Sequence, residues 1–307
     1  MATNPDTIQQ QEADRRKHEA EAAALLLLLG RLKQTGALPA GALYSLPAMI
    51  ANARVKPRTF RRIIPTEALR SDAATPYFDI VRAWMSQKPA LIEAYAAALP
   101  ARGEALAPTA VADLQRAVAA AERRVAARLP AITSKIAPSM KRLADWHRGQ
   151  WVARIKAATG IDVSPLTGQT EVAAVVANAI AANVQAASAL SSEIAGKTGA
   201  ALVESLVANV PASDAATALS GTFSAAKRRA ARKGVDAADG LSGGMTRARR
   251  VAAGLSKWRW RHSPNVRFPR PAHVARDGKV FGPGNEPAER CGQLRGCQCY
   301  EEPVLFT

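Results

Sequence analysis

The stretch TRARRVAAGLSKWRWRHS, residues 246–263, contains a change of secondary structure at Gly254. Before the glycine, alanine and arginine are typical of a helix, and glycine commonly follows the last residue of a helix. Beyond it, Trp258 and Trp260 alternate with basic residues, as in a strand that buries one face. The stretch therefore predicts a helix before Gly254 and a strand after it.

Alanine, leucine and valine dominate the first 250 residues, and proline, glycine and capping residues separate the apolar runs. This pattern predicts an extended helical array. Proline near the first helical position indicates two helix starts, one with a cap at Thr75 before Pro76 and one at Ser86 before Pro89. The predicted helices cover residues 8–33, 76–85, 90–99, 110–129, 131–158 with a kink at Pro138, 171–194, 199–210, 215–232 and 244–253.

Aromatic residues, prolines and glycines become more frequent after Gly254. Besides the Trp258–Trp260 alternation, GKVF (278–281) and PVLF (303–306) are candidate strands, and GLSGGMTRARR (240–250) is interpreted as a flexible turn before a basic helix. The predicted fold is mainly α, an extended helical array followed by a small α+β C-terminal module. Its expected parts are an N-terminal helix and basic connector (1–70), a helical domain (71–212) and the α+β module (213–307).

The formal charge is +17 and the isoelectric point is about 10.5, which favours binding to a polyanion such as nucleic acid. A solvated or protein-binding surface is the alternative. Trp258 and Trp260 could stack on bases, although tryptophans on one strand face are more often core. We expect contact with double-stranded DNA without sequence preference, since basic side chains meet phosphate rather than base edges. The predicted DNA-binding residues are Lys227, Arg228, Arg229, Arg232, Lys233, Arg247, Arg249, Arg250, Lys257, Arg259 and Arg261.

All three cysteines of the chain lie near its C-terminal end, at Cys291, Cys297 and Cys299. An odd number with one tightly spaced pair is a poor disulfide framework, so we expect reduced thiols. If the turn-rich segment from His273 folds back, one imidazole and three thiolates would form a Cys3His zinc site. Unreactive buried thiols beside a hydrogen-bonded histidine are the alternative, in which case no cofactor is expected.

No motif of a known catalytic site is present, and we expect a binding protein rather than an enzyme. The alternative is a metal-dependent His-Asn-His nuclease using His262, Asn265 and His273. The acidic residues near the C-terminal end, including Glu289, are interpreted as turns and solvated surface. The apolar run at residues 22–30 is too short to span a membrane, and we expect a soluble chain.

The C-terminal part contains an ordered series of elements: a basic helix ending in glycine, an aromatic-x-Trp strand, Arg-Pro-x-His, an Asp-Gly turn with a hydrophobic pair, and Cys-x-Cys before proline. In this order and spacing it resembles the C-terminal domain of the minor head, or head morphogenesis, proteins of tailed phages, the phage Mu F-like family. The resemblance extends upstream to about residue 75. The residues that carry it are Arg247, Arg250, Gly254, Trp258, Trp260, Arg270, Pro271, His273, Asp277, Gly278, Val280, Phe281, Cys297, Cys299 and Pro303.

This resemblance implies a virion structural component located in the capsid interior near the portal vertex, and in the host cytoplasm during assembly. Its implied partners are the portal protein and packaged DNA, with a major capsid or scaffolding protein as a further candidate and no membrane before infection. The apolar residues 25–29 lie outside the family-like region. They predict either an anchor on the portal or packing within the chain itself.

Overall fold

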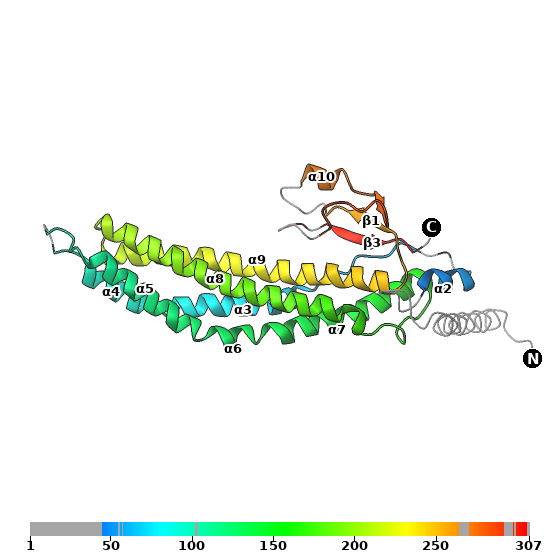
Figure 1. Cartoon of the computed structure of the whole chain (residues 1–307), viewed down its shortest axis with the longest axis horizontal. Coiled ribbons are helices and arrows are strands. Elements are labelled where there is room, and N and C mark those ends of the chain that lie inside the picture. Colours follow the sequence, from blue (N-terminus) through cyan, green and yellow to red (C-terminus); the bar gives the residue numbers. More distant parts are fainter. Residues whose placement is uncertain are drawn as a thin grey trace, which may run out of the picture. The chain divides into compact units, whose positions relative to one another are not determined.

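The structure is a computed structural model that describes residues 45–54, 56, 58–101, 104–263, 270–291, 297 and 299–305. Within these residues the chain is mainly helical, with a small three-stranded antiparallel sheet near the C-terminal end (Figure 1). The predicted fold class is therefore confirmed. The predicted helix at 8–33, with its apolar residues 25–29 and the run at 22–30, lies outside the described residues, as does Asn265.

The chain divides into two compact units, each built from separate stretches of sequence. A helical unit comprises Thr66–Lys141 and Ala177–Ala238, and a mixed unit comprises the residues up to Pro65, Arg142–Val176 and those from Asp239 onward. This division differs from the predicted succession of 1–70, 71–212 and 213–307. The difference arises because three long helices each contribute residues to both units, which a linear reading of the sequence does not anticipate.

In the described chain, two pairs of predicted helices each form one helix: the pair at 171–194 and 199–210, and the pair at 215–232 and 244–253. Besides a short 3-10 turn at Thr170–Val172, the helices that precede the sheet are α2 (Leu46–Asn52), α3 (Glu67–Met85), α4 (Lys88–Ala98), α5 (Ala110–Ala126), α6 (Leu129–Thr133), α7 (Ile136–Thr159), α8 (Ala173–Val207) and α9 (Ala212–Ala252).

Two of the predicted helix ends are displaced. The N-cap of α3 is Thr66, whose hydroxyl accepts a hydrogen bond from the backbone N–H of Leu69, so the predicted cap at Thr75 is wrong and Pro76 lies inside the helix. The predicted kink at Pro138 is instead a break before α7, and Pro138 lies in its first turn, where a missing N–H costs nothing. Gly160 follows α7 with φ of +75°, as predicted for the end of that helix.

Helix α9 contains the glycines that were interpreted as a flexible turn. Gly240, Gly243 and Gly244 are all helical, so the two predicted helices at 215–232 and 244–253 are one helix. In the mixed unit, a Cβ on Gly244 would lie 2.8 Å from Val175 Cγ1. The absence of a side chain at Gly244 therefore permits close packing of α9 and does not form a turn. Local sequence rules do not distinguish these two roles of a glycine.

The helical unit is held by polar contacts between helices as well as by apolar packing. The hydroxyl of the buried Tyr77 in α3 donates to Asn183 Oδ1 in α8 at 2.5 Å, and burial followed by the charge of Asp236 raises the pKa of Tyr77 to about 12. The indole N–H of Trp84 donates to Ser191 Oγ at 3.1 Å. These bonds satisfy polar groups that burial would otherwise penalise.

In the described chain, Thr170–Val207 is long and apolar enough to span a membrane by length and composition alone. Alanine supplies much of the hydropathy of α8. Leu190, Ile194 and Leu202 are buried in the helical unit, whereas Ile180 is only half-buried and Val207 is exposed. The helix thus has a packed apolar face, as expected for a helix in a bundle.

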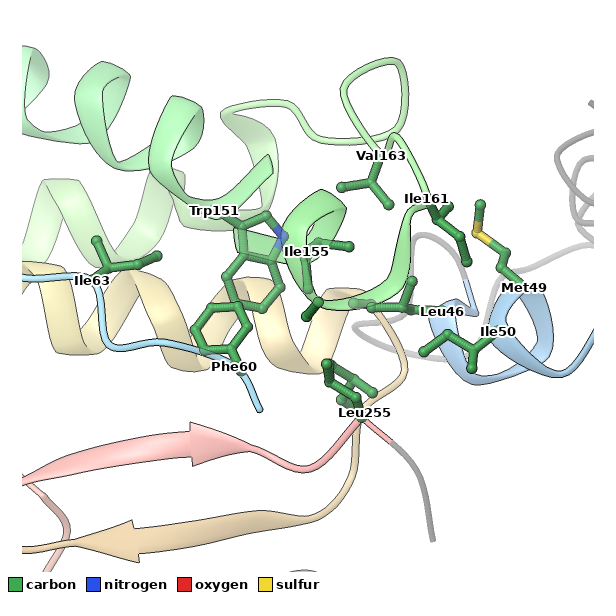
Figure 2. Packing of buried hydrophobic residues seen from close by; sticks show 13 residues of the cluster. Leu46, Met49, Ile50, Phe60, Ile63, Trp151, Ile155, Ile161, Val163 and Leu255 are labelled. Carbon is green, nitrogen blue, oxygen red and sulfur yellow. The ribbon is translucent and has the colours of Figure 1, made fainter. Parts of the chain in front are cut away.

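The core of the mixed unit joins segments that are distant in sequence. Figure 2 shows Phe60 and Ile63 of the connector beside Trp151 and Ile155 of α7, with Leu255 nearby. The rings of Phe60 and Trp151 have centroids 5.2 Å apart. The connector after α2 is therefore anchored by apolar packing to α7.

The sheet contains β1 (Trp258–Arg261), β2 (Val280–Phe281) and β3 (Tyr300–Pro303), in the order β2-β1-β3. Both neighbours pair with β1 in antiparallel orientation. The predicted strands at WRWR and GKVF are confirmed. The predicted position of the third strand is wrong, since β3 is YEEP (300–303) rather than PVLF (303–306). Glu302 of β3 pairs with Arg259 and Arg261 of β1, and Glu301 pairs with Arg247 and Arg250 of α9.

Candidate metal centre

The inner face of the sheet is an aromatic layer. Trp258 and Trp260 are fully buried, and the ring of Phe281 in β2 lies 5.0 Å from that of Trp258. The two tryptophans are therefore core residues, as the strand pattern favours, and they are not available to stack on bases. Their burial supplies a large apolar area to a small module.

His273 lies on this layer, in the short helix α10 (Pro271–Val274). Its imidazole packs edge-on against Trp260, with centroids 5.2 Å apart, and the residue is 2% exposed. The ring is therefore shielded from solvent. Either nitrogen needs a partner inside the protein, because a buried polar group without one is costly.

The partners of one ring nitrogen are two thiols that precede β3. His273 Nδ1 lies 3.4 Å from Cys297 Sγ and 3.6 Å from Cys299 Sγ, and the three ligand atoms all lie within 4.8 Å of one another. In tetrahedral zinc coordination, with Zn–S of about 2.3 Å and Zn–N of about 2.0 Å, neighbouring sulfur and nitrogen atoms are about 3.5 Å apart. The three residues are thus placed so that they could hold a metal ion.

The other ring nitrogen of His273 faces a carboxylate. Nε2 lies 3.3 Å from Glu289 Oε2, and the guanidinium of Arg276 lies 3.7 Å from the same oxygen. Donation from Nε2–H to Glu289 leaves Nδ1 with its lone pair directed at the thiols. Metal-binding histidines commonly have such a carboxylate partner, which sets their tautomer and orientation.

Cys291, the fourth predicted ligand, lies outside this group of three. It belongs to the same apolar cluster as Trp258, Trp260 and Cys299, and no cysteine of the chain forms a disulfide. Burial, then the charge of Glu301, raises the pKa of the Cys291 thiol far above its usual range. The neighbouring Cys297 and burial do the same for the pKa of Cys299. The geometry therefore indicates a Cys2His set rather than the predicted Cys3His set.

The predicted DNA-binding residues differ widely in exposure. Arg249 and Arg250 are 1% and 2% exposed, so their assignment to a DNA-binding surface is wrong. Both arginines have partners within the mixed unit. Arg249 donates to the carbonyl of Gly168 at 3.3 Å. Arg250 donates to the carbonyl of Leu255 at 2.7 Å and lies 3.5 Å from Glu301 Oε2. Arg247 binds the other carboxylate oxygen of Glu301 at 2.6 Å. The network is a structural ion cluster.

The remaining predicted residues reach solvent to different degrees. On β1, Arg259 and Arg261 are about one-third exposed and both pair with Glu302. On the part of α9 in the helical unit, Arg229 pairs with Glu193 at 2.8 Å. Lys233 is half-buried, and the exposed members are Lys227, Arg228, Arg232 and Lys257. DNA contact by these exposed residues stays a prediction.

The sequence pattern did not predict the roles of several polar residues. Glu289, Glu301 and Glu302 were interpreted as surface or turn residues, yet Glu301 and Glu302 are 6% and 5% exposed and ion-paired. Glu302 lies opposite Arg259 in the register of β1 and β3, whereas Glu301 lies opposite Trp260 and pairs with Arg247 and Arg250 of α9. These pairings depend on how β3 and α9 meet β1, so no local sequence signal reveals them.

Compared with known proteins, the chain matches no family model, no curated sequence and no solved structure.

Proposed function

We propose that the chain is a phage minor head protein that acts by binding, with its C-terminal module stabilised by a zinc ion. The observation that carries the proposal is the convergence of the family-like pattern in space. Trp260, His273, Phe281 and the two cysteines of Cys-x-Cys come from separate segments and meet in one cluster. If the pattern describes one folded module, its residues are expected to lie close together in space.

The two glycines of the family-like pattern adopt backbone conformations that favour glycine, which supports the same proposal. Gly254 ends α9 with φ of +72°, and Gly278 in the Asp-Gly turn has φ of +76°, conformations that other residues adopt only with strain. Asp277 accepts the backbone N–H of His262 at 2.9 Å, and Gly278 N–H donates to the carbonyl of Trp260. These bonds tie the segment carrying His273 to β1.

Zinc is the metal that the donor set favours. Two thiolates and one imidazole are borderline-soft ligands, and the sulfur–nitrogen separations match tetrahedral geometry. The ion would be held by His273, Cys297 and Cys299, with a fourth position for water or another donor. Its role would be to link α10 to the segment before β3 in a module with a small core.

The proposed activity is association with the portal protein and with packaged double-stranded DNA in the capsid interior near the portal vertex. The alternative of a His-Asn-His nuclease has less support, because the imidazole of His273 is buried and directed at Cys297, Cys299 and Glu289. A nuclease would degrade plasmid with magnesium, manganese or zinc and lose that activity in His273→Ala. We expect no cleavage.

Co-expression with the portal protein encoded in the same gene cluster, followed by affinity capture of the portal, tests the proposal. We expect the chain to co-purify. A variant lacking residues 1–40 locates the contact: loss of co-purification places it in that segment, as the apolar residues 25–29 predict, and retention places it in the remaining chain. Failure of the full chain to co-purify at any salt concentration would contradict the proposed function.

A further inference from the structure

A second surface of the mixed unit, on the face of the sheet opposite the aromatic layer, gathers cations from two distant segments. Antiparallel register places Arg259 opposite Glu302 and Arg261 opposite Tyr300, so these four residues share the outer face of β1 and β3. The guanidinium of Arg62, from the connector after α2, lies 4.7 Å from the centre of the Tyr300 ring. The connector thus runs beside this face.

Between the connector and the sheet lies a depression of about 160 Å³. Two arginines and one carboxylate line it, together with apolar groups; the lining residues are Arg58, Thr59, Phe60, Arg259, Glu302, Pro303, Val304 and Leu305. A water molecule occupies about 30 Å³ in the liquid, so the depression has room for a phosphate group with bound waters. We infer that it receives the phosphate backbone of double-stranded DNA.

The backbone of the connector is held in place before any ligand binds. The backbone N–H of Arg58 donates to the carbonyl of Ala158 at 2.7 Å, and Ser242 Oγ donates to the carbonyl of Ile63 at 3.4 Å. Between these bonds, Phe60 is buried against Trp151, as Figure 2 shows. Positioning in advance reduces the entropy that binding costs.

The arginines of β1 are likewise oriented, by the buried carboxylate of Glu302. That carboxylate accepts from Arg261 Nε and lies 3.7 Å from Arg259, and its hydrogen bond raises the pKa of Arg261. A guanidinium has five N–H donors, so one shared carboxylate leaves further donors of each arginine for a ligand. Arg58 lines the same depression as Arg259, and Arg62 lies over the ring of Tyr300, so the connector adds two further arginines to this surface.

The chemistry of this surface favours phosphate over other ligands. Arginine matches phosphate oxygens in a bidentate manner, and the chain as a whole carries a charge of +17. The lining offers no group arranged to read a base edge, since its polar side chains are guanidinium groups, one hydroxyl and one carboxylate already paired with arginine. The contact is therefore to the backbone and independent of sequence. That the ligand is DNA rests on the proposed function.

Titration of the full chain against two unrelated 20-base-pair duplexes at several salt concentrations, read by fluorescence anisotropy, tests the inference. We expect both duplexes to bind equally. The Arg58→Gln, Arg259→Gln double variant should bind at least about fivefold more weakly, and its slope of log affinity against log salt should be smaller by about 2, since each lost phosphate contact removes about 0.9.

Arg61→Gln is the matched control, because Arg61 is an exposed residue of the same connector and is not part of the lining. It should bind DNA like the unchanged chain. Arg58→Gln alone, at an exposed position, keeps the test valid if the double variant does not fold, with an expected decrease in slope of about 1.

Equal binding by Arg58→Gln and Arg61→Gln would overturn the inference, and so would a strong preference for one duplex. Loss of portal co-purification in Arg58→Gln with duplex binding retained would instead assign the surface to protein contact. The portal experiment is independent of DNA. A chain that co-purifies with the portal but binds no duplex therefore contradicts this inference and the DNA association of the proposed function, and it leaves the portal association standing.

Discussion

The guanidinium of Arg249 donates to Nδ1 of His147 across 3.4 Å in the core of the mixed unit. The other ring nitrogen, Nε2, lies 3.0 Å from Thr246 Oγ1, whose hydroxyl donates to the carbonyl of Ser242. Because a guanidinium can only donate, Nδ1 is the acceptor and Nε2 carries the proton. Burial, followed by the charge of Arg249, lowers the pKa of His147 to about 3.

This pKa predicts a loss of stability in mild acid. In the unfolded chain a histidine has a pKa of about 6.5 and gains a proton below it, whereas folded His147 stays neutral until about pH 3. Stability should therefore fall as the pH decreases from about 6.5. At pH 5 the loss should be about 2 kcal/mol relative to pH 7.5, measured by urea unfolding. His147→Gln cannot titrate, and an equally steep pH dependence in that variant would contradict the assignment.

Close packing in the helical unit predicts that Gly234→Ala is destabilising although alanine favours helices. A Cβ on Gly234 would lie 2.3 Å from Ala74 Cβ and 2.5 Å from Ala74 Cα, so α3 or α9 would have to shift. We expect a loss of about 1–3 kcal/mol, detectable as a lower melting temperature. Gly221→Ala, in the same helix with nothing within 4 Å, should gain up to about 1 kcal/mol. Equal effects of the two substitutions would exclude this packing.

The zinc hypothesis predicts about one zinc ion per chain in protein purified without chelator or a metal-affinity tag, measured by elemental analysis. Cys297→Ser and Cys299→Ser should lower both the zinc content and the melting temperature. Cys291→Ser should retain zinc, because its sulfur lies outside the group of three ligands. Zinc-free protein, or equal zinc loss in all three variants, would argue against this ligand set.

Glu289→Gln tests the orientation of His273 separately from its coordination. The amide cannot accept the Nε2 proton as strongly as the carboxylate 3.3 Å away does. Zinc affinity, measured by competition with a chromogenic chelator, should fall about 10–100-fold while the stoichiometry at saturation is unchanged. Glu286→Gln is the matched control, since Glu286 pairs with Arg290 instead. An unchanged affinity in Glu289→Gln would mean that Glu289 does not position the imidazole.

The ion cluster around Glu301 predicts a large cost for removing its charge. Glu301→Gln would leave Arg250, itself 2% exposed, without its buried counter-ion. The unfolding free energy should fall by about 3 kcal/mol or more, since an unpaired buried charge is costly. Urea unfolding at pH 7.5 measures this. A loss below about 1 kcal/mol would mean that Arg250 is satisfied by the carbonyls of Leu255 and Ser256 alone.

The local structure of this protein follows from its sequence. Helices before Gly254 and a strand at WRWR follow from side-chain periodicity and from the conformational freedom of glycine, both of which act over a few residues. It also identified His273, Cys297 and Cys299 as candidate ligands, because thiols and imidazoles are chemically distinctive wherever they lie in a chain. Local rules failed at Pro76 and Gly244, where packing against other helices outweighs the intrinsic preference.

Which charges face solvent, and which distant residues come into contact, depends on the tertiary structure. Arg249 and Arg250 look like their exposed neighbours in the sequence, and only the positions of Glu171, His147 and Glu301 make them core residues. Cys291 and Cys297 have the same thiol side chain, so the sequence does not distinguish them as ligands. Their distances from His273 depend on how the chain folds back beside β3. Long-range contacts of this kind arise from packing the whole chain, and short-range patterns in the sequence do not encode them.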